Sequence, residues 1–121
     1  MYSKQVADHL SNPRNAGELP DPSGIGDVVN EVCLDRIRLT IRVNDGVLTD
    51  ARMKVSGCPP TIAAASVLTE LIIGRSVGDL ESLKPDDIET ALGRLPAAKR
   101  HCSYLAIDAL RAAIADVRRA V

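Results

Sequence analysis

The sequence predicts an α+β fold in which helices pack on one face of a small antiparallel three-stranded sheet. Apolar and polar residues alternate over residues 36–43 and again over 47–55, on either side of turn residues 44–46, and this period of two indicates a β-hairpin. After Cys58 the period changes, and two prolines introduce an alanine-rich helical stretch. Strands followed by a run of helices are typical of this fold class.

The chain is expected to begin with a short helix and an irregular connection. Residues 3–10 carry apolar side chains at helical spacing, and Asn12-Pro13 ends this helix. Residues 13–26 are rich in Pro, Gly, Asn and Asp, which predicts a connection without regular structure. Residues 26–32 then predict the first strand of the sheet.

The two hairpin strands are expected to bury one face. The predicted inward residues are Ile37, Leu39, Ile41 and Val43 on the first strand and Thr49, Ala51 and Met53 on the second. The outward residues include Arg36, Arg38, Arg42, Arg52 and Lys54. They predict a basic patch on a nearly neutral protein, which is either a solvated face or a surface for docking a protein.

The helical segments after the hairpin are predicted at residues 61–73, 76–83, 84–93 and 99–120. Gly74 is a natural stop for the first, and Ser76 can cap the second. In the last segment an apolar stripe runs from Ala106 to Val121. These segments supply the helical layer that covers the apolar face of the sheet.

Composition narrows the possible functions. At 121 residues, with 45% hydrophobic and 26% charged residues, the chain is expected to fold as a single domain, residues 1–121. An aromatic fraction of 2% and a net charge of -1 argue against nucleic-acid partners. No apolar run approaches the roughly 18 residues that span a bilayer, and the first residues are too charged for a signal peptide. The expectation is therefore a cytoplasmic protein without a membrane partner.

Each cysteine falls at a junction between predicted elements. Cys33 precedes the hairpin, Cys58 lies between the hairpin and a helix, and Cys102 lies near the start of the last helix. Asp35 and His101 stand close to two of them in sequence. Thiolates, an imidazole and a carboxylate suit zinc or an iron-sulfur cluster.

The spacing of the cysteines leaves other interpretations open. Separations of 25 and 44 residues fit no local metal knuckle, and a free cysteine is most often a small buried hydrophobe. A redox thiol is a further alternative. Cys58 departs most from the buried-hydrophobe interpretation, because a thiolate at a helix N-terminus is stabilised by the amide dipoles. The same reasoning predicts a thiolate at Cys102, beside His101.

Enzymatic chemistry has little support in the sequence. The chain lacks phosphate-binding and zinc-protease motifs. The adjacent side chains of His101 and Cys102 point in different directions along a helix, which disfavours a nucleophilic pair. They can share a metal only if the helix begins near them. We therefore expect a protein that is not an enzyme.

Several motifs taken together resemble a known family. They are YS and DH at residues 2–3 and 8–9, NPRN at 12–15, VNDG at 43–46, DAR at 50–52, GC followed by IA at 57–63, and K.HCS at 99–103. This pattern runs through nearly the whole chain and resembles the U-type iron-sulfur cluster scaffolds, the IscU or NifU N-terminal domain family.

The resemblance implies a site and a set of partners. Its cluster-site residues correspond to Cys33, Asp35, Cys58, His101 and Cys102, which would bind iron and a 2Fe-2S cluster, or zinc in the same site. Cys102 matches the position that receives sulfur. The implied partners are a cysteine desulfurase, an electron donor such as a ferredoxin, and apoproteins that accept the finished cluster.

Three departures from the family pattern accompany the resemblance. Leu34 stands where the family has glycine, and Pro59-Pro60 stand where small flexible residues are usual, so both loops are expected to be stiff. The family's chaperone-recognition LPPVK segment is LPAAK at residues 95–99, which leaves a dedicated Hsp70-type chaperone open. The family's downstream C-x2-C domain does not occur in this sequence, which favours a stand-alone scaffold.

The metal ligands also allow alternatives of another class. One is a zinc-stabilised partner module or activator of a cysteine desulfurase, in which the metal is structural. A metal-free persulfide carrier is another. The same ligands serve each of these interpretations, so the sequence does not separate them.

Overall fold

A computed structural model describes residues 2–119 of the chain, and the predicted end of the last helix at Ala120 and Val121 lies outside the described residues. The elements in chain order are α1 (Lys4–Ser11), β1 (Gly24–Val29), β2 (Arg36–Asn44), β3 (Val47–Ser56), α2 (Pro59–Ile72), α3 (Val77–Leu80), α4 (Pro85–Ala91), the 3-10 turn Ala97–Lys99 and α5 (His101–Arg119). Every predicted element is present, and the first strand begins two residues earlier than expected.

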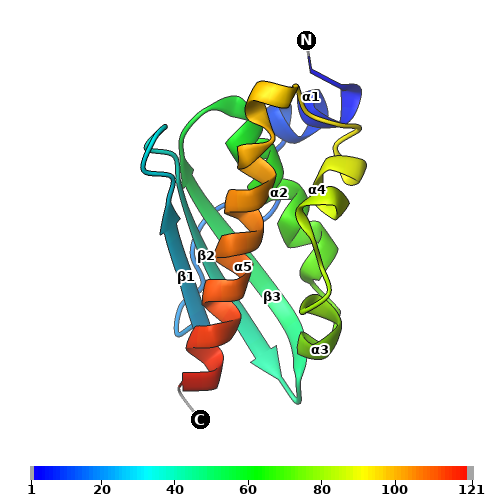
Figure 1. Ribbon diagram of the computed structural model, residues 1–121. Helices are drawn as coiled ribbons and strands as arrows, with labels where there is room; N and C mark the ends of the chain where they lie inside the picture. The colour runs from blue at the N-terminus through cyan, green and yellow to red at the C-terminus, as the bar shows by residue number, and fades with distance from the viewer. Residues whose placement is uncertain (1, 120–121) are drawn as a thin grey trace.

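The helices cover one face of a three-stranded antiparallel sheet, as predicted. The strand order is β1-β2-β3, with β2 in the centre. Helix α5 packs on β1 and β2, and helix α2 packs on β3 (Figure 1). Helix α4 contacts both α2 and α5. No helix of the described chain combines the length and the apolar character that crossing a bilayer demands.

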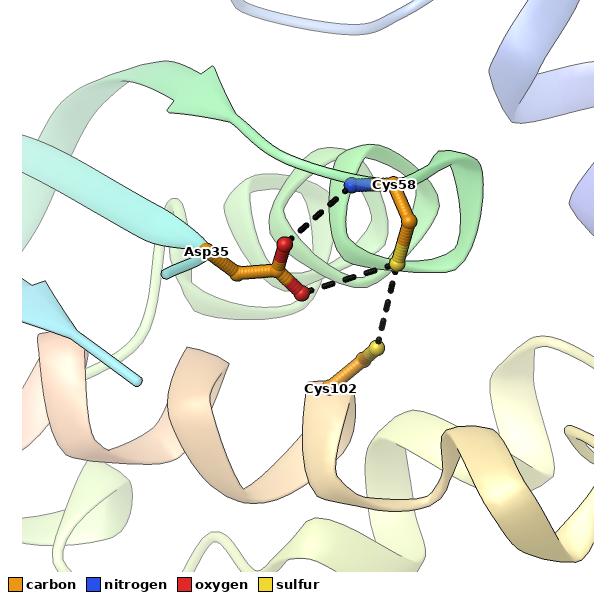
Figure 2. A group of neighbouring side chains, drawn as sticks. All are labelled: Asp35, Cys58 and Cys102. Carbon is orange, nitrogen blue, oxygen red and sulfur yellow. Dashed lines mark hydrogen bonds between the residues drawn. The ribbon is translucent and has the colours of Figure 1, made fainter. Parts of the chain in front are cut away.

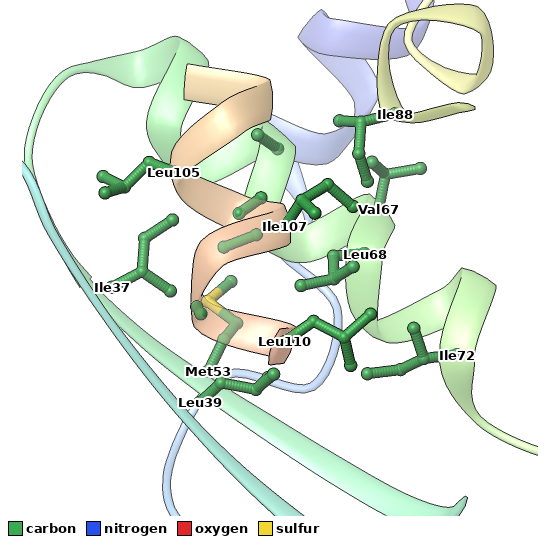
Figure 3. Close-up of a cluster of buried hydrophobic side chains, with 14 of the residues drawn as sticks. Ile37, Leu39, Met53, Val67, Leu68, Ile72, Ile88, Leu105, Ile107 and Leu110 are labelled. Carbon is green, nitrogen blue, oxygen red and sulfur yellow. The ribbon is translucent and has the colours of Figure 1, made fainter. Parts of the chain in front are cut away.

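The core between the sheet and the helices is aliphatic. Figure 3 shows Ile37 and Leu39 from β2 and Met53 from β3 facing Leu68 of α2 and Leu110 of α5. These side chains are almost completely buried. The core thus holds the sheet and the two long helices together without an aromatic side chain, as the composition requires.

A register shift changes the inward face of the second hairpin strand. Arg42 pairs with Asp50 but Val43 pairs with Leu48, so Thr49 is the extra residue of a β-bulge. A slip of one residue moves a side chain to the other face. The prediction for Thr49 was therefore wrong: Leu48 is fully buried and Thr49 is exposed.

The outer face of the sheet is mixed in charge rather than basic. Arg36 donates to Asp27 at 2.8 Å, and Arg38 donates to Glu18 at 2.8 Å. Lys54 lies 3.9 Å from the same Glu18 carboxylate. The predicted basic patch was therefore wrong, because carboxylates from the connection and from β1 lie among the basic side chains.

The connection between α1 and β1 is hydrogen-bonded to strands β2 and β3. Gly17 donates from its backbone to the Met53 carbonyl at 2.9 Å and so covers the open edge of β3. The Leu19 backbone N–H donates to Thr40 Oγ1 at 3.0 Å. Helix α1 is joined to α2 by buried His9, whose Nδ1 lies 2.7 Å from Ser66 Oγ.

Helix α5 lies unusually close to β1 because Gly26 has no side chain. A Cβ placed on Gly26 would lie 2.0 Å from the Ala109 carbonyl oxygen. The approach is reinforced where the Ile25 N–H donates to Asp116 Oδ2 at 2.8 Å. Close packing here fixes the position of α5, whose first residues enter the site described below.

Gly26→Ala is therefore expected to destabilise the fold by about 1–3 kcal/mol, the usual range for overpacking a tight contact. Gly78→Ala is the matched control, because a Cβ at Gly78 meets nothing within 4 Å. Urea unfolding followed by circular dichroism measures both changes. Equal stability of the two variants would show that α5 does not depend on this contact.

Candidate metal centre

Three predicted site residues meet at one end of the molecule. Asp35 immediately precedes β2, Cys58 lies between β3 and α2, and Cys102 is in the first turn of α5. Their ligand atoms all lie within 4.8 Å of one another. Figure 2 shows the Asp35 carboxylate and the two sulfurs pointing toward a common point.

Asp35 is a buried carboxylate rather than a solvated turn residue, with 4% of its surface exposed. Its Oδ1 accepts a hydrogen bond from the Cys58 backbone N–H at 3.3 Å, and its Oδ2 accepts one from Thr61 Oγ1 at 2.8 Å. The Cys58 thiol also donates to Oδ2, at 3.5 Å. The carboxylate therefore links the start of β2 to the first turn of α2.

Gly57 makes room for this carboxylate. A Cβ on Gly57 would lie 2.6 Å from Asp35 Oδ1, closer than two such atoms approach in real structures. The Gly57-Cys58 pair is thus a steric requirement of the site as well as a sequence motif.

The surroundings of Asp35 favour its ionised form. Burial acts to raise the pKa of Asp35, but the hydrogen bonds from Thr61 and Cys58 and the nearby His101 outweigh burial and hold that pKa below its usual range. A charged carboxylate is the form that binds a cation.

His101 and Cys102 approach the site together because α5 begins at His101. His101 Nε2 lies 3.6 Å from Cys102 Sγ and 3.7 Å from Asp35 Oδ2. The preceding residue, Arg100, donates to Glu89 of α4 at 3.0 Å, which anchors the entry to the helix. The condition set by the sequence, a helix that starts next to these residues, is met.

The separations of Cys58 from Cys102 and from Asp35 are close to those of a tetrahedral metal site. Bonds of about 2.3 Å to sulfur and about 2.0 Å to oxygen or nitrogen place two sulfurs about 3.8 Å apart and a sulfur about 3.5 Å from an oxygen or nitrogen. The Cys58 and Cys102 sulfurs are 4.0 Å apart, and Cys58 Sγ lies 3.5 Å from Asp35 Oδ2. Two thiols and a carboxylate at these separations, with the His101 imidazole 3.6 Å from one of the sulfurs, suit zinc or iron.

Cys33 lies apart from the other site residues. It is exposed, in a turn where its backbone N–H and that of Val32 donate to Asn30 Oδ1. Leu34, also exposed, adopts a left-handed φ of 61°, a conformation that glycine adopts more easily. Within residues 2–119, the close group of ligand atoms comprises Asp35, Cys58 and Cys102. His101 lies beside two of these residues but outside the group, and Cys33 lies apart from it.

Cys102 differs from its predicted state as a reactive thiolate. It is fully buried, and burial together with neighbouring Cys58 and Asp35 raises the pKa of its thiol to about 12, although the Thr61 hydrogen bond acts to lower it. The sequence prediction weighed only the helix start, whereas removal from water is the larger effect. In the described conformation the Cys102 thiol is protonated at neutral pH.

Thr61 is the site residue that the sequence analysis missed. Its fully buried hydroxyl contacts Asp35, Cys58 and Cys102. The available signal was its position three residues after Cys58, on the first turn of the helix that Cys58 begins.

The three thiols are therefore expected to react in order of exposure. Iodoacetamide at neutral pH should modify Cys33 more than about tenfold faster than Cys102, with Cys58 between them, because alkylation requires an accessible thiolate. Peptide mapping by mass spectrometry measures the rates, and urea-unfolded protein is the control in which the differences disappear. Fast modification of Cys102 in folded protein would contradict the buried site.

Known proteins share both the sequence and the fold. The family described as NifU-like N terminal domain matches residues 1–121. The chain is 43% identical over 119 residues to iron-sulfur cluster assembly scaffold protein IscU 1 of Archaeoglobus fulgidus, covering 98% of this chain and 78% of that protein. It is 44% identical over 121 residues to the scaffold protein IscU of Escherichia coli, covering 97% of this chain and 94% of that protein.

A solved structure confirms the fold. The crystal structure of an N-terminal NifU-like protein from Brucella abortus matches with a TM-score of 0.81 at 20% identity, covering 98% of this chain and 95% of that one. At this identity the likeness is evidence for the fold alone. The sequence matches carry the assignment further: this chain belongs to the NifU-like N-terminal domain family.

Proposed function

We propose that this protein is a scaffold on which iron-sulfur clusters are assembled and from which they pass to acceptor proteins. The observation that carries the proposal is the convergence of Asp35, Cys58 and Cys102, with His101 beside them, at separations that suit a metal ion. Family membership supports it, because relatives that match nearly the whole chain are named as such scaffolds. The protein holds a cargo rather than catalysing a reaction on a small substrate.

The ligands take different parts in this proposal. Cys58, Cys102 and His101 bind iron through soft and borderline donors, and Cys33 joins them when its exposed turn closes over the cluster. Asp35 is a hard donor and a weak match for an iron-sulfur unit, so it leaves one position easily displaced. An easily displaced ligand suits a donor that must release its cargo. When iron is absent, zinc occupies the same site, held by Asp35, Cys58, His101 and Cys102.

Partners follow from the chemistry of the cargo. A cysteine desulfurase supplies sulfur as a persulfide, and an electron donor such as a ferredoxin supplies electrons. Cluster-acceptor apoproteins receive the finished cluster.

In the sulfur step the Cys102 thiolate attacks the terminal sulfur of the desulfurase persulfide, the S–S bond breaks, and the desulfurase thiolate leaves. Because Cys102 is buried, the start of α5 or the turn of residues 31–33 opens before this attack.

Anaerobic reconstitution tests the proposal. The protein is incubated with ferrous iron, cysteine and a cysteine desulfurase, and optical spectroscopy then follows the charge-transfer bands of a 2Fe-2S cluster. A cluster that forms and passes to an apo-ferredoxin supports the scaffold. Tight zinc binding without cluster formation would instead favour a zinc-stabilised partner module or an activator of the desulfurase.

Replacing Asp35 separates a labile scaffold site from a structural metal site. Asp35→Ala is expected to lengthen cluster lifetime under air or chelator several-fold and to slow transfer to an apo-ferredoxin, because the displaceable ligand is lost. The metal-free variant should also lose about 1–3 kcal/mol of stability, because the Cys58 N–H and the Thr61 hydroxyl lose their acceptor.

The exposed Asp79 of α3 provides the control for this experiment. Asp79→Ala should leave cluster lifetime and transfer rate unchanged. If Asp35→Ala instead loses its metal outright and no longer folds, Asp35 is a structural ligand and the zinc-module alternative is the better one.

Sulfur delivery is tested by single cysteine variants. Cys102→Ser should abolish persulfide labelling by the desulfurase, and Cys33→Ser should retain much of it, if Cys102 is the final acceptor. Mass spectrometry of the labelled protein gives the result. Equal loss in both variants would indicate a site that merely requires all of its ligands, and labelling that survives Cys102→Ser but not Cys33→Ser would make the exposed thiol the acceptor.

A further inference from the structure

Thr61 is not one of the predicted ligands, yet its hydroxyl contacts three residues of the candidate site. Its Oγ1 lies 2.8 Å from Asp35 Oδ2, 3.2 Å from Cys102 Sγ and 3.3 Å from Cys58 Sγ. The side chain is fully buried between α2 and the start of α5. One hydroxyl thus lies against three of the atoms that would bind a metal.

The first turn of α2 explains why a hydroxyl is needed there. A helix ordinarily offers free backbone N–H groups to anions at its N-terminus, but its first two residues here are Pro59 and Pro60, which have none. The Thr61 N–H donates to the Cys58 carbonyl at 3.0 Å. The Cys58 N–H serves Asp35 Oδ1, and the Thr61 side chain provides a donor to Asp35 Oδ2 that the backbone of residues 59–61 does not provide.

A hydroxyl carries a single proton, so its contacts compete. Donation to the Asp35 carboxylate at 2.8 Å and donation to the Cys102 sulfur at 3.2 Å are alternatives. Whichever acceptor receives the proton, the hydroxyl keeps both neighbours at a fixed separation. This matters because hydrogen bonds to ligand atoms orient them and adjust their affinity for the metal.

We propose that Thr61 is a positioning residue of the metal centre, whose hydroxyl holds Asp35, Cys58 and Cys102 at metal-binding separation without itself binding the metal. The inference rests on the proposed function, since it concerns the same site. It predicts that the hydroxyl, and not the shape of the side chain, sets the affinity and the ligand field of the site.

Titration with cobalt(II) under anaerobic conditions tests this inference directly, because its visible bands report both binding and ligand geometry. Thr61→Val removes the hydroxyl and keeps the shape, and it should lower cobalt affinity about 10–100-fold and shift the bands. Thr61→Ser restores the hydroxyl and should return affinity and spectrum to those of the unchanged protein. Thermal unfolding of each metal-free variant establishes that it is folded.

Thr69 provides a matched control on the same helix. It is also fully buried, and its hydroxyl donates to the Ser66 carbonyl at 2.7 Å, roughly 12 Å along the helix from Thr61. Thr69→Val should leave cobalt affinity and spectrum unchanged. If Thr61→Val does not fold, Thr61→Ala carries the same prediction.

The outcomes separate this inference from the proposed function. If the unchanged protein binds cobalt and Thr61→Val matches it in affinity and spectrum, the positioning role is wrong and the scaffold proposal stands. A Thr61→Ser variant that behaves like Thr61→Val would also overturn it, because packing and not the hydroxyl would then matter. If the unchanged protein binds no cobalt at all, the proposed function and the positioning role fail together.

Discussion

The burial of the Asp35 carboxylate against the start of α2 is the constraint on which the candidate metal centre depends. Its two oxygens accept hydrogen bonds from the Cys58 N–H and the Thr61 hydroxyl. A buried carboxylate is costly unless such donors surround it. Gly57 is needed for the approach, since any side chain there would collide with the carboxylate. One acidic residue thereby fixes the junctions that carry Cys58 and Thr61.

The remaining candidate ligands, His101 and Cys102, are positioned by the packing of α5. Gly26 lets this helix approach β1 closely, and the ion pair between Arg100 and the nearly buried Glu89 fixes where the helix begins. His101 and Cys102 follow directly, and His101 Nε2 lies 3.7 Å from the Asp35 carboxylate. The aliphatic core thus supports the helix starts that carry Cys58 and Cys102, whereas Cys33 belongs to an exposed turn.

Periodicity was sufficient to predict the elements, because both hairpin strands and the long helices carry clear apolar patterns. It could not locate the bulge that exposes Thr49 and buries Leu48, since a bulge depends on cross-strand pairing and not on local sequence. For the site, residue types and junction positions left several interpretations open, and the resemblance to the scaffold family was needed to group Asp35, Cys58 and Cys102 with Cys33 and His101. Burial was not predictable in the same way: it raises the pKa of the Cys102 thiol to about 12, and it makes Thr61 a neighbour of three candidate ligand atoms.

The central claim is that the folded chain already brings Asp35, Cys58 and Cys102 to metal-binding separation, with His101 close to two of them. X-ray absorption spectroscopy at the zinc edge of the zinc-loaded protein tests it most directly, because the fine structure counts sulfur neighbours separately from oxygen and nitrogen. The account predicts two sulfurs at about 2.3 Å and two lighter donors at about 2.0 Å. A first shell of three or more sulfurs would place Cys33 on the metal in the resting protein and contradict the preassembled site.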